Sequence, residues 1–402
     1  MMSSGQKPLC CYVVGTFDTK GEELRYLVSV LRSLGIGIVT VDLNTSGATT
    51  EADISACQVA GHHVRGVEAV TKAGSRSAAV VAMADAFAKF IISRQDIGGI
   101  IGLGGSSGTW LVTKGMREIP IGIPKIMVTT VASGDISGYI GASDICVVPS
   151  ITDIFGLNDI LKGTLATAAG MLAGAMNQKP PIVPDGRPLI GLTMFGVTTP
   201  CVTAVVEALK PRFQCLVFHA TGIGGQVMEK LVDEEKIVGV IDITTTDIAD
   251  LICGGVFPAH SDRLGAIIRS EIPYVGSVGA LTSVNFGAPA TVPERYKLRD
   301  LIYVTPQVTV MRTTAEENEK IGNWLGSKLG QCKGPVCVLL PMKGLSTEHT
   351  LESDSAIDGL YTSLEIAIIP SANRRVTRLP YNINDKEFAA AIVSSFESMF
   401  QK

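Results

Sequence analysis

The sequence contains a glycine- and serine-rich loop whose composition suits an anion. The segment Gly102-Leu-Gly-Gly-Ser-Ser-Gly-Thr109 lies between an apolar run and a segment with helical spacing. Its backbone N–H groups carry little side-chain bulk, and such groups at the start of a helix bind phosphate. It is neither the Gly-x-Gly-x-x-Gly motif nor a Walker A loop, because Gly108 comes one residue late and no Lys-Ser/Thr follows. The loop predicts a phosphate site; a tight strand–helix turn is the alternative.

A second candidate loop is GTFDTKGEE (15–23), which precedes an amphipathic segment. Thr19 and Glu22 have the spacing of a capping box, so helix initiation explains part of the loop. Lys20 opposes the helix dipole at this position, which makes sense if an anion binds there. We therefore expect ligand contacts from Thr16, Asp18, Thr19 and Lys20.

Three further loops in the second half are rich in hydroxyl groups and glycine: FGVTTP (195–200), HATGIGG (219–225) and DITTTD (242–247). Thr199 before Pro200 has the form of a helix start, with a capping hydroxyl. His219 or Asp247 could act as a general base, although each could equally be structural. Carboxylates beside threonines suit a magnesium-bound phosphate or a polyhydroxylated substrate. The predicted substrate contacts are Thr198, Thr199, His219, Thr221, Gly222, Gly224, Gly225, Thr244 and Thr245.

These loops must be positioned by alternating strands and helices. The apolar pattern predicts strands at 9–17, 35–43, 97–103, 125–131, 145–150, 188–195, 215–220, 239–243 and 335–341. It predicts helices at 20–34, 75–93, 107–117, 160–176, 200–209, 224–232, 246–253, 314–329 and 385–399. The proline-rich stretch 177–188 reads as a linker. The fold class is therefore α/β: two Rossmann-like, doubly wound parallel-sheet domains in tandem, over residues 1–180 and 181–402, with an interdomain cleft.

Composition excludes several classes of function. The net charge of −4 and the lack of a basic cluster argue against a nucleic-acid ligand. Nine cysteines without a Cys-x-x-Cys pair favour a reducing compartment and no zinc site, and we predict no metal bound by protein side chains alone. The weakly polar run 164–176 is too short to span a bilayer, and the first residues lack the layout of a signal peptide. We expect a cytoplasmic protein without a membrane partner.

The motifs together are more specific than any one loop. GTFDTKGEEL, GIIGLGGSSGT, IGIPKIMVTTVASGD, TMFGVTTPCV, VFHATGIGGQVMEKL, DITTTDIAD and MRTTAEEN occur in this order. The series resembles the amino-terminal-domain family of the tomato mosaic virus resistance protein, an ATP-binding-domain family of uncharacterised function, and the chain looks like a bacterial-type member. The resemblance implies ATP bound with Mg²⁺ on the first domain, and a homodimer. Its expected nucleotide contacts are Thr16, Asp18, Thr19, Lys20, Gly104, Gly105, Ser106, Ser107, Gly108, Thr109, Thr129, Thr130, Ser133 and Gly134.

The sequence departs from the plant pattern in two places. The plant protein continues into a barrel-like domain that resembles phosphoenolpyruvate hydrolases, whereas this sequence stops at 402, so a joint activity would need a separate barrel partner. The stretch 341–359 also lacks the glycine- and proline-rich character expected of relatives.

The resulting hypothesis is an ATP-binding enzyme that acts on a small phosphorylated or polyhydroxylated metabolite in the interdomain cleft. Lys20 would neutralise phosphate charge, and His219 or Asp247 would move a proton. The alternatives are a non-catalytic, nucleotide-gated binding module and an enzyme of phosphosugars or sugar acids that does not use ATP.

Overall fold

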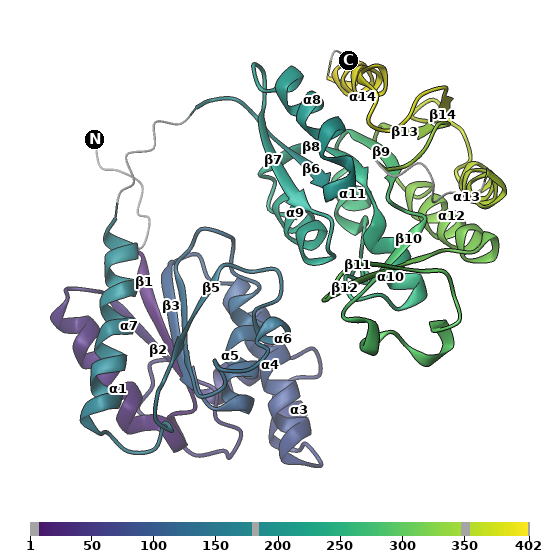
Figure 1. The fold of residues 1–402 in the computed structure, drawn as a ribbon. Helices are drawn as coiled ribbons and strands as arrows, with labels where there is room; N and C mark the ends of the chain where they lie inside the picture. The colour runs from purple at the N-terminus through teal and green to yellow at the C-terminus, as the bar shows by residue number, and fades with distance from the viewer. Residues whose placement is uncertain (1–7, 179–184, 347–353, 401–402) are drawn as a thin grey trace, which may run out of the picture. The chain divides into compact units, whose positions relative to one another are not determined.

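The chain folds into two compact α/β units. The computed structural model describes residues 8–178, 185–346 and 354–400. The chain divides into unit 1, Met1–Val183, and unit 2, Pro184–Lys402. Each unit has a parallel sheet with helices on both faces (Figure 1), which confirms the predicted fold class of two Rossmann-like domains in tandem. The predicted cleft between the domains stays a prediction.

Unit 1 has a parallel sheet of order β2-β1-β3-β4-β5 over its described residues. Its strands are β1 (Cys10–Gly15), β2 (Ile38–Asp42), β3 (Ile97–Gly104), β4 (Lys125–Thr129) and β5 (Ile145–Pro149). Its helices are α1 (Phe17–Ser33), α2 (Ala56–Ala60), α3 (Glu68–Thr71), α4 (Arg76–Ile92), α5 (Ser106–Met116), α6 (Ser137–Ile140) and α7 (Asp159–Asn177). The helices α1 and α7 cover one face of the sheet, and α4 and α5 cover the other.

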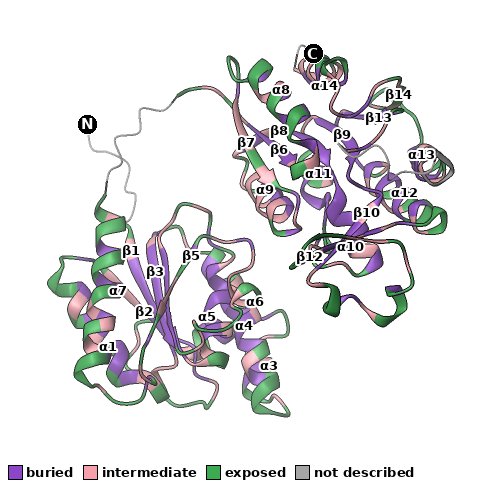
Figure 2. Ribbon diagram, viewed as in Figure 1, coloured by how far each residue is buried: buried purple, intermediate pink, exposed green. Residues whose placement is uncertain are grey.

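The apolar strands are explained by burial on both faces of the sheet. In β1, Cys11 and Val13 pack with α1 and α7, whereas Tyr12 and Val14 pack on the side of α4 and α5. Successive side chains of a strand point to opposite faces, so a strand covered on both sides has no polar alternation. Figure 2 shows β1 and β3 in the buried centre of unit 1.

Unit 2 has a parallel sheet of order β14-β13-β9-β8-β6-β7 and a small antiparallel sheet of order β10-β12-β11, counted over its described residues. Its strands are β6 (Leu189–Met194), β7 (Gln214–His219), β8 (Ile237–Thr244), β9 (Tyr274–Gly279), β10 (Ser283–Phe286), β11 (Leu301–Thr305), β12 (Val308–Arg312), β13 (Val336–Pro341) and β14 (Arg374–Leu379). Its helices are α8 (Thr199–Leu209), α9 (Ile223–Asp233), α10 (Thr246–Cys253), α11 (Gly265–Ser270), α12 (Ala315–Leu329), α13 (Asp354–Ala367) and α14 (Lys386–Met399).

The helices α8 and α14 cover one face of the unit 2 sheet, and α9 to α12 lie on the other. The antiparallel sheet, α11, β9, α13 and β14 have no counterpart in the sequence prediction, which left 255–310 as an irregular stretch. Residues 179–184 of the predicted linker and 347–353 of the atypical stretch lie outside the described residues.

The structure also bears on the cysteines and on membrane-spanning helices. None of the nine cysteines is paired in a disulfide. Across the described ranges, no helix has the length and apolar character needed to cross a membrane.

The two units share the same arrangement of their first strands. Counted from the first strand of each unit, both sheets have the order second–first–third–fourth–fifth, with β14 added at the edge of unit 2. In this order the winding direction reverses between the first and third strands, and ligands of open α/β sheets bind at the carboxyl ends there. The fold therefore offers two comparable positions, one over β1 and β3 and one over β6 and β8.

Candidate functional site

The position over β1 and β3 brings together the three loops predicted to bind a nucleotide. Loop 15–23 follows β1 and loop 102–109 follows β3, and these strands are neighbours in the sheet. Loop 129–135 follows β4, which pairs with β3 on its other side. All strands are parallel, so the three loops leave the same edge.

The helix α5 begins with N–H groups that donate to no atom of the described residues. Its N-cap is Gly105, and no side chain caps it. The Thr109 N–H donates to the Gly105 carbonyl at 2.7 Å. Among the described residues, no acceptor is hydrogen-bonded to the N–H groups of Ser106, Ser107 or Gly108. Ser106 and Ser107 are exposed, so this helix end is open to an anion.

Two glycines of the loop have packing roles, but Gly105 does not. A Cβ on Gly102 would lie 2.5 Å from Cγ1 of Val112, and one on Gly104 would lie 3.0 Å from Cα of Gly108. These glycines therefore let α5 pack closely on β3. A Cβ on Gly105 would meet nothing closer than Oγ1 of Thr130, at 3.7 Å. Packing does not require glycine at 105, which leaves access to the backbone as its physical reason.

The predicted contacts after β4 divide into a buried and an exposed group. Thr109 and Thr129 are buried, and their Oγ1 atoms are hydrogen-bonded to each other at 2.6 Å. Thr129 also accepts the Val131 N–H at 3.2 Å, so this pair holds α5 against β4. Thr130, Ser133 and Gly134 are exposed at the same edge and stay predicted contacts.

The predicted capping box in the first loop is wrong. The helix α1 begins at Phe17 with Thr16 as its N-cap, and Thr19 lies inside the first turn. In a capping box the Thr19 hydroxyl would accept the Glu22 N–H. It is instead hydrogen-bonded to the Thr16 hydroxyl at 2.8 Å. Asp42, at the end of β2, accepts the Phe17 N–H at 3.0 Å. A side chain of the protein thus already occupies part of the α1 N-terminus.

Lys20 lies at a kink in α1, where its backbone leaves the helical region with φ −125° and ψ 21°. Its Nζ donates to the carbonyl of Ile154, in the loop after β5. A phosphate at this edge would compete with that carbonyl for the ammonium group. Asp18 is exposed and accepts a hydrogen bond from Ser46 at 2.8 Å.

The position over β6 and β8 in unit 2 uses its hydroxyl groups internally. Thr198 and Thr244 are fully buried, with their Oγ1 atoms hydrogen-bonded at 2.7 Å. Thr245 is also buried and donates to the Ser277 carbonyl at 3.2 Å. The N-cap of α8 is Thr198 rather than Thr199, and it makes no side-chain cap. Asn384 instead accepts the Cys201 N–H at 3.3 Å at the start of α8.

The glycines of loop 219–225 are explained by close packing. Gly222 has φ +71°, and a Cβ there would lie 2.2 Å from the Pro258 carbonyl oxygen. A Cβ on Gly224 would lie 1.9 Å from the carbonyl oxygen of His219. A Cβ on Gly225 would lie 3.3 Å from Nε of Arg263 and from Oδ2 of Asp247, a tight side-chain contact. Gly222 and Gly224 therefore need glycine whether or not a ligand binds.

The His219 side chain is exposed at the end of β7 and meets the Phe195 ring edge-on, with centroids 5.1 Å apart. No carboxylate of the described residues is hydrogen-bonded to its ring. A general base is commonly oriented by such a partner. Thr221 is partly buried nearby, and Thr199 is exposed.

Asp247 belongs to a buried ion cluster that the sequence analysis missed. Fully buried Arg263 donates to Asp242 at 2.7 Å, Glu229 at 2.9 Å and Asp247 at 3.0 Å. Burial raises the pKa of the Glu229 and Asp247 carboxyls, while Arg263 opposes that rise. One sequence signal was available, because Glu229 occupies an apolar helical position between Met228 and Val232.

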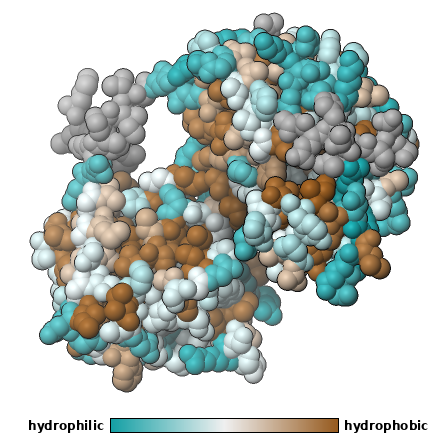
Figure 3. All heavy atoms as spheres, in the orientation of Figure 1, coloured by the Kyte–Doolittle hydropathy of each residue, from teal (hydrophilic) through white to brown (hydrophobic). Residues whose placement is uncertain are grey.

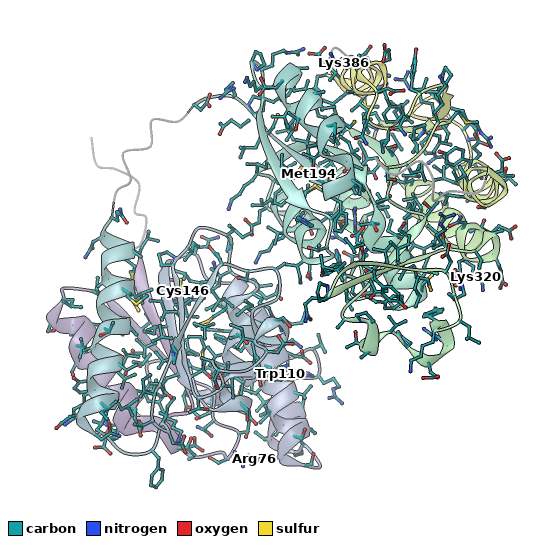
Figure 4. The ribbon with its side chains drawn as sticks, in the orientation of Figure 1. Arg76, Trp110, Cys146, Met194, Lys320 and Lys386 are labelled. Atoms are coloured by element: carbon teal, nitrogen blue, oxygen red, sulfur yellow. The ribbon has the colours of Figure 1, made fainter. Side chains whose placement is uncertain are left out.

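The described residues contain no cluster of three or more His, Cys, Asp or Glu side chains able to hold a metal ion. Figure 4 shows side chains around the α4 and α5 region, with Arg76 and Trp110 labelled.

The chain matches both models of one family. The amino-terminal domain of the uncharacterised protein family UPF0261 matches residues 10–181, and its carboxy-terminal domain matches residues 187–400. A UPF0261 protein of Mesorhizobium japonicum is 53% identical over 390 residues, which cover 95% of this chain and 97% of that protein.

Tomato proteins are also similar. The ToMV resistance protein Tm-1 of Solanum lycopersicum is 40% identical over 418 residues, covering 96% of this chain but 55% of the tomato protein. The ToMV susceptible protein tm-1 of the same plant is also 40% identical, over 425 residues that cover 97% of this chain and 56% of the tomato protein. Among solved structures, an esterase domain from Rhodothermus marinus aligns with 54% of this chain and 88% of its own at 13% identity, with a TM-score of 0.29. A likeness that weak has no bearing on function.

Proposed function

Because the chain belongs to the uncharacterised protein family UPF0261, whose name specifies no activity, we propose a function from its geometry: unit 1 binds ATP by its phosphates at the edge over β1 and β3. The observation that carries this proposal is the unpaired set of N–H groups at Ser106, Ser107 and Gly108. An open helix N-terminus at a topological switch point is the usual position for phosphate in this class of fold.

Neighbouring groups add to the electrostatic fit. The exposed hydroxyls of Ser106, Ser107 and Thr130 can donate to phosphate oxygens. Lys20 can supply a positive charge if its ammonium group leaves the Ile154 carbonyl. ATP is favoured over a simple phosphate because three adjacent loops offer donors along the edge, enough for more than one phosphate group.

The same residues are compatible with Mg²⁺ brought in by the nucleotide. Magnesium usually keeps several waters and binds through one or two carboxylates together with substrate phosphates. Asp18, in the first turn of α1, is an exposed carboxylate that could take that role. When bound, the ion would supply neutralisation of phosphate charge, and the protein residues would orient the phosphates.

We further propose that the bound ATP serves a reaction on a small phosphorylated or polyhydroxylated metabolite, with Lys20 stabilising phosphate charge. Phosphoryl transfer depends chiefly on positioning and electrostatics, which the loops of unit 1 can supply. His219 remains the candidate general base of unit 2 because it is exposed, whereas Asp247 is buried and paired with Arg263.

A second candidate function is a non-catalytic, nucleotide-gated binding module. The observation that favours it is the burial of Thr198, Thr244 and Thr245, which leaves unit 2 with few hydroxyls free for a substrate. A phosphosugar enzyme that does not use ATP is the third, since the α5 N–H groups bind any phosphate ester.

Calorimetric titration of the full chain tests the proposal. ATP with magnesium should bind more tightly than ADP, and both should bind more tightly than glucose 6-phosphate. Conversion of ATP to ADP on addition of a metabolite panel, followed by chromatography, would favour the enzyme, and binding without turnover would favour the gated module. Equal or tighter binding of glucose 6-phosphate would favour the phosphosugar reading, and no binding of any phosphate compound would overturn the site.

We also propose two protein partners, a second copy of this chain and a separate barrel-like protein. We propose a cytoplasmic homodimer, and exposed apolar side chains such as Phe155 and Leu298 are available on the two units for contacts. Figure 3 shows apolar residues, in brown, on the viewed face of each unit. The match covers 55% and 56% of the two tomato relatives, and we propose a separate barrel-like protein as a further partner of this chain. Light scattering coupled to size exclusion would test the dimer.

The two tomato relatives are equally similar to this chain although one is named a resistance protein and the other a susceptible protein, so virus resistance is not carried over.

A further inference from the structure

A hollow of about 660 Å³ opens beside the first turn of α5 in unit 1. Its wall includes Arg76, Val80 and Val81 from α4, Ser106 and Trp110 from α5, and Tyr139 from α6. The hollow therefore continues directly from the N–H groups proposed to hold phosphate. Figure 4 labels Arg76 and Trp110, which come from the two neighbouring helices.

The charge of the hollow suits a negatively charged ligand. The helices α4 and α5 flank β3 in sequence and both run back along it, so both N-termini lie at the ligand edge. Positive ends of two helix dipoles thus meet there, and Arg76 adds an exposed guanidinium. None of the residues that line the hollow is acidic.

The other lining residues suit a flat ring. Trp110 and Tyr139 are partly buried, and Val81 is 45% exposed. Lys114 holds the indole from one side, with its Nζ 5.5 Å from the ring centroid, and is itself paired with Asp85. A small sugar phosphate would leave these aromatic and apolar surfaces unused, whereas an aromatic group would cover them.

We infer that this hollow is the subsite for a flat aromatic group whose negatively charged end lies on the α5 N–H groups. The inference rests on the proposed function, because the phosphate site fixes the charged end of the ligand. The ring can come from two sources. It is either the base of the bound nucleotide or a separate ring-bearing carboxylic acid that binds beside the phosphates.

The sequence contains two tryptophans, which allows a direct optical test. In a Trp324→Phe variant, Trp110 is the sole indole. ATP should quench its fluorescence, whereas inorganic triphosphate, which lacks a ring, should bind without quenching. In a Trp110→Phe variant, ATP should leave the emission of Trp324 unchanged. If Trp324→Phe proves unstable, the difference between the unmodified chain and Trp110→Phe gives the same readout.

Affinities give the second readout. Stacking of a base on an aromatic side chain contributes about 1–3 kcal/mol, so Tyr139→Ala should weaken ATP binding about fivefold or more. It should leave the affinity for triphosphate unchanged. Tyr303→Ala, at an exposed tyrosine of β11, is the matched control and should change neither affinity.

The outcomes separate the inference from the proposed function. If benzoate added with triphosphate quenches Trp110 and ATP does not, the ring belongs to a second molecule and the subsite stands. If ATP and triphosphate bind equally well and neither ATP nor benzoate affects Trp110, the subsite is overturned while the phosphate site remains. If calorimetry detects no binding of ATP or triphosphate, the phosphate site fails and the subsite fails with it.

Discussion

The two units present the same strand order and similar loops, and each buries a pair of hydrogen-bonded threonines, but they differ in the polar groups that they leave at the surface. At the carboxyl edge of unit 1, Ser106 and Ser107 are exposed and their N–H groups have no acceptor among the described residues. At the corresponding edge of unit 2, Thr198 and Thr244 are fully buried and hydrogen-bonded to each other. Buried polar groups must be paired inside the protein, whereas exposed ones remain available to a ligand.

This difference shows that a hydroxyl-rich loop at a switch point is not sufficient evidence for a binding site. Unit 2 gathers its charges around Arg263 below the surface, and unit 1 leaves its donors at the surface. Under the proposed function, the exposed polar groups at the edge of unit 1 bind the ligand, whereas the buried polar groups of unit 2 contribute to stability. Substitutions at matched positions should therefore have effects of different kinds.

Removal of Arg263 should have the largest effect. In Arg263→Met, three buried carboxylates lose their shared partner, and breaking a buried ion pair from one side costs about 3–5 kcal/mol. Urea denaturation should show this loss of free energy of unfolding. Arg269→Met is the control, because Arg269 is about half exposed and its pairs with Asp233 and Asp262 contribute about 0–1 kcal/mol. Equal losses in both variants would contradict a structural role for the buried cluster.

The pH dependence of stability should also distinguish the units. Asp250 of unit 2 is fully buried, and burial raises its pKa from 3.8 to about 6, against hydrogen bonds from Asn285 and Phe257. Between these values the folded state holds a proton that the unfolded chain has released. The free energy of unfolding should therefore fall as the pH rises from about 4 to 6, by roughly 3 kcal/mol from this group. Urea denaturation across this range should show a smaller fall in Asp250→Asn.

In unit 1, Asp144 should make stability depend on pH in the opposite direction. Burial would raise the pKa of Asp144, but hydrogen bonds from Lys125 and the Gly122 N–H hold it below its ordinary value. Its contribution to stability is present above pH 3.8 and is lost as the pH falls through the lowered pKa. Asp144→Asn should reduce the fall in the free energy of unfolding at low pH, measured by urea denaturation. An unchanged fall would contradict this assignment.

Two glycines three residues apart should separate binding from packing in unit 1. Gly105→Val should abolish the ATP-dependent rise in melting temperature, which corresponds to about 2.7 kcal/mol at a hundredfold excess over the dissociation constant. Its effect on the unliganded protein should stay within about 1 kcal/mol, the cost of a poorer N-cap. Gly102→Val should instead destabilise the unliganded protein, because its side chain would meet Val112. Thermal unfolding with and without ATP measures both effects.

Lys20→Ala should give the smallest effect. A charge-assisted hydrogen bond to phosphate contributes about 1.5–3 kcal/mol, and part of this is offset because Lys20 first leaves the Ile154 carbonyl. We expect ATP binding to weaken about tenfold in calorimetry, equivalent to about 1.4 kcal/mol. Lys72→Ala, at an exposed lysine paired with Glu68, is the control. Unchanged affinity in Lys20→Ala would remove Lys20 from the site but leave the α5 contacts intact.

Much of the fold followed from the sequence because strands covered on both faces must be apolar. The pattern located β1, β3, β6 and β8, and with them both switch points. It missed β9, whose buried run YVGSVG is interrupted by glycine and serine, and it missed β10 to β12 and β14, which are short or partly exposed. The start of α1 was also misplaced, because Asp42 from a different strand holds the first turn.

The site was only partly predictable for a similar reason. GLGGSSGT was identified from its bare backbone, a local property of the sequence. Whether a hydroxyl such as Thr244 points inward depends on Thr198, 46 residues away in the chain. The Arg263 cluster likewise joins Arg263 and Glu229 to the two carboxylates of loop 242–247, so no single local motif reveals it.

A crystal structure of the full chain with ATP and magnesium is the most direct test of the contrast between the two edges. The account predicts phosphate density within hydrogen-bond distance of the Ser106, Ser107 and Gly108 N–H groups, with the edge over β6 and β8 unchanged. Nucleotide bound beside Thr198 and Thr244, with the start of α5 vacant, would contradict it.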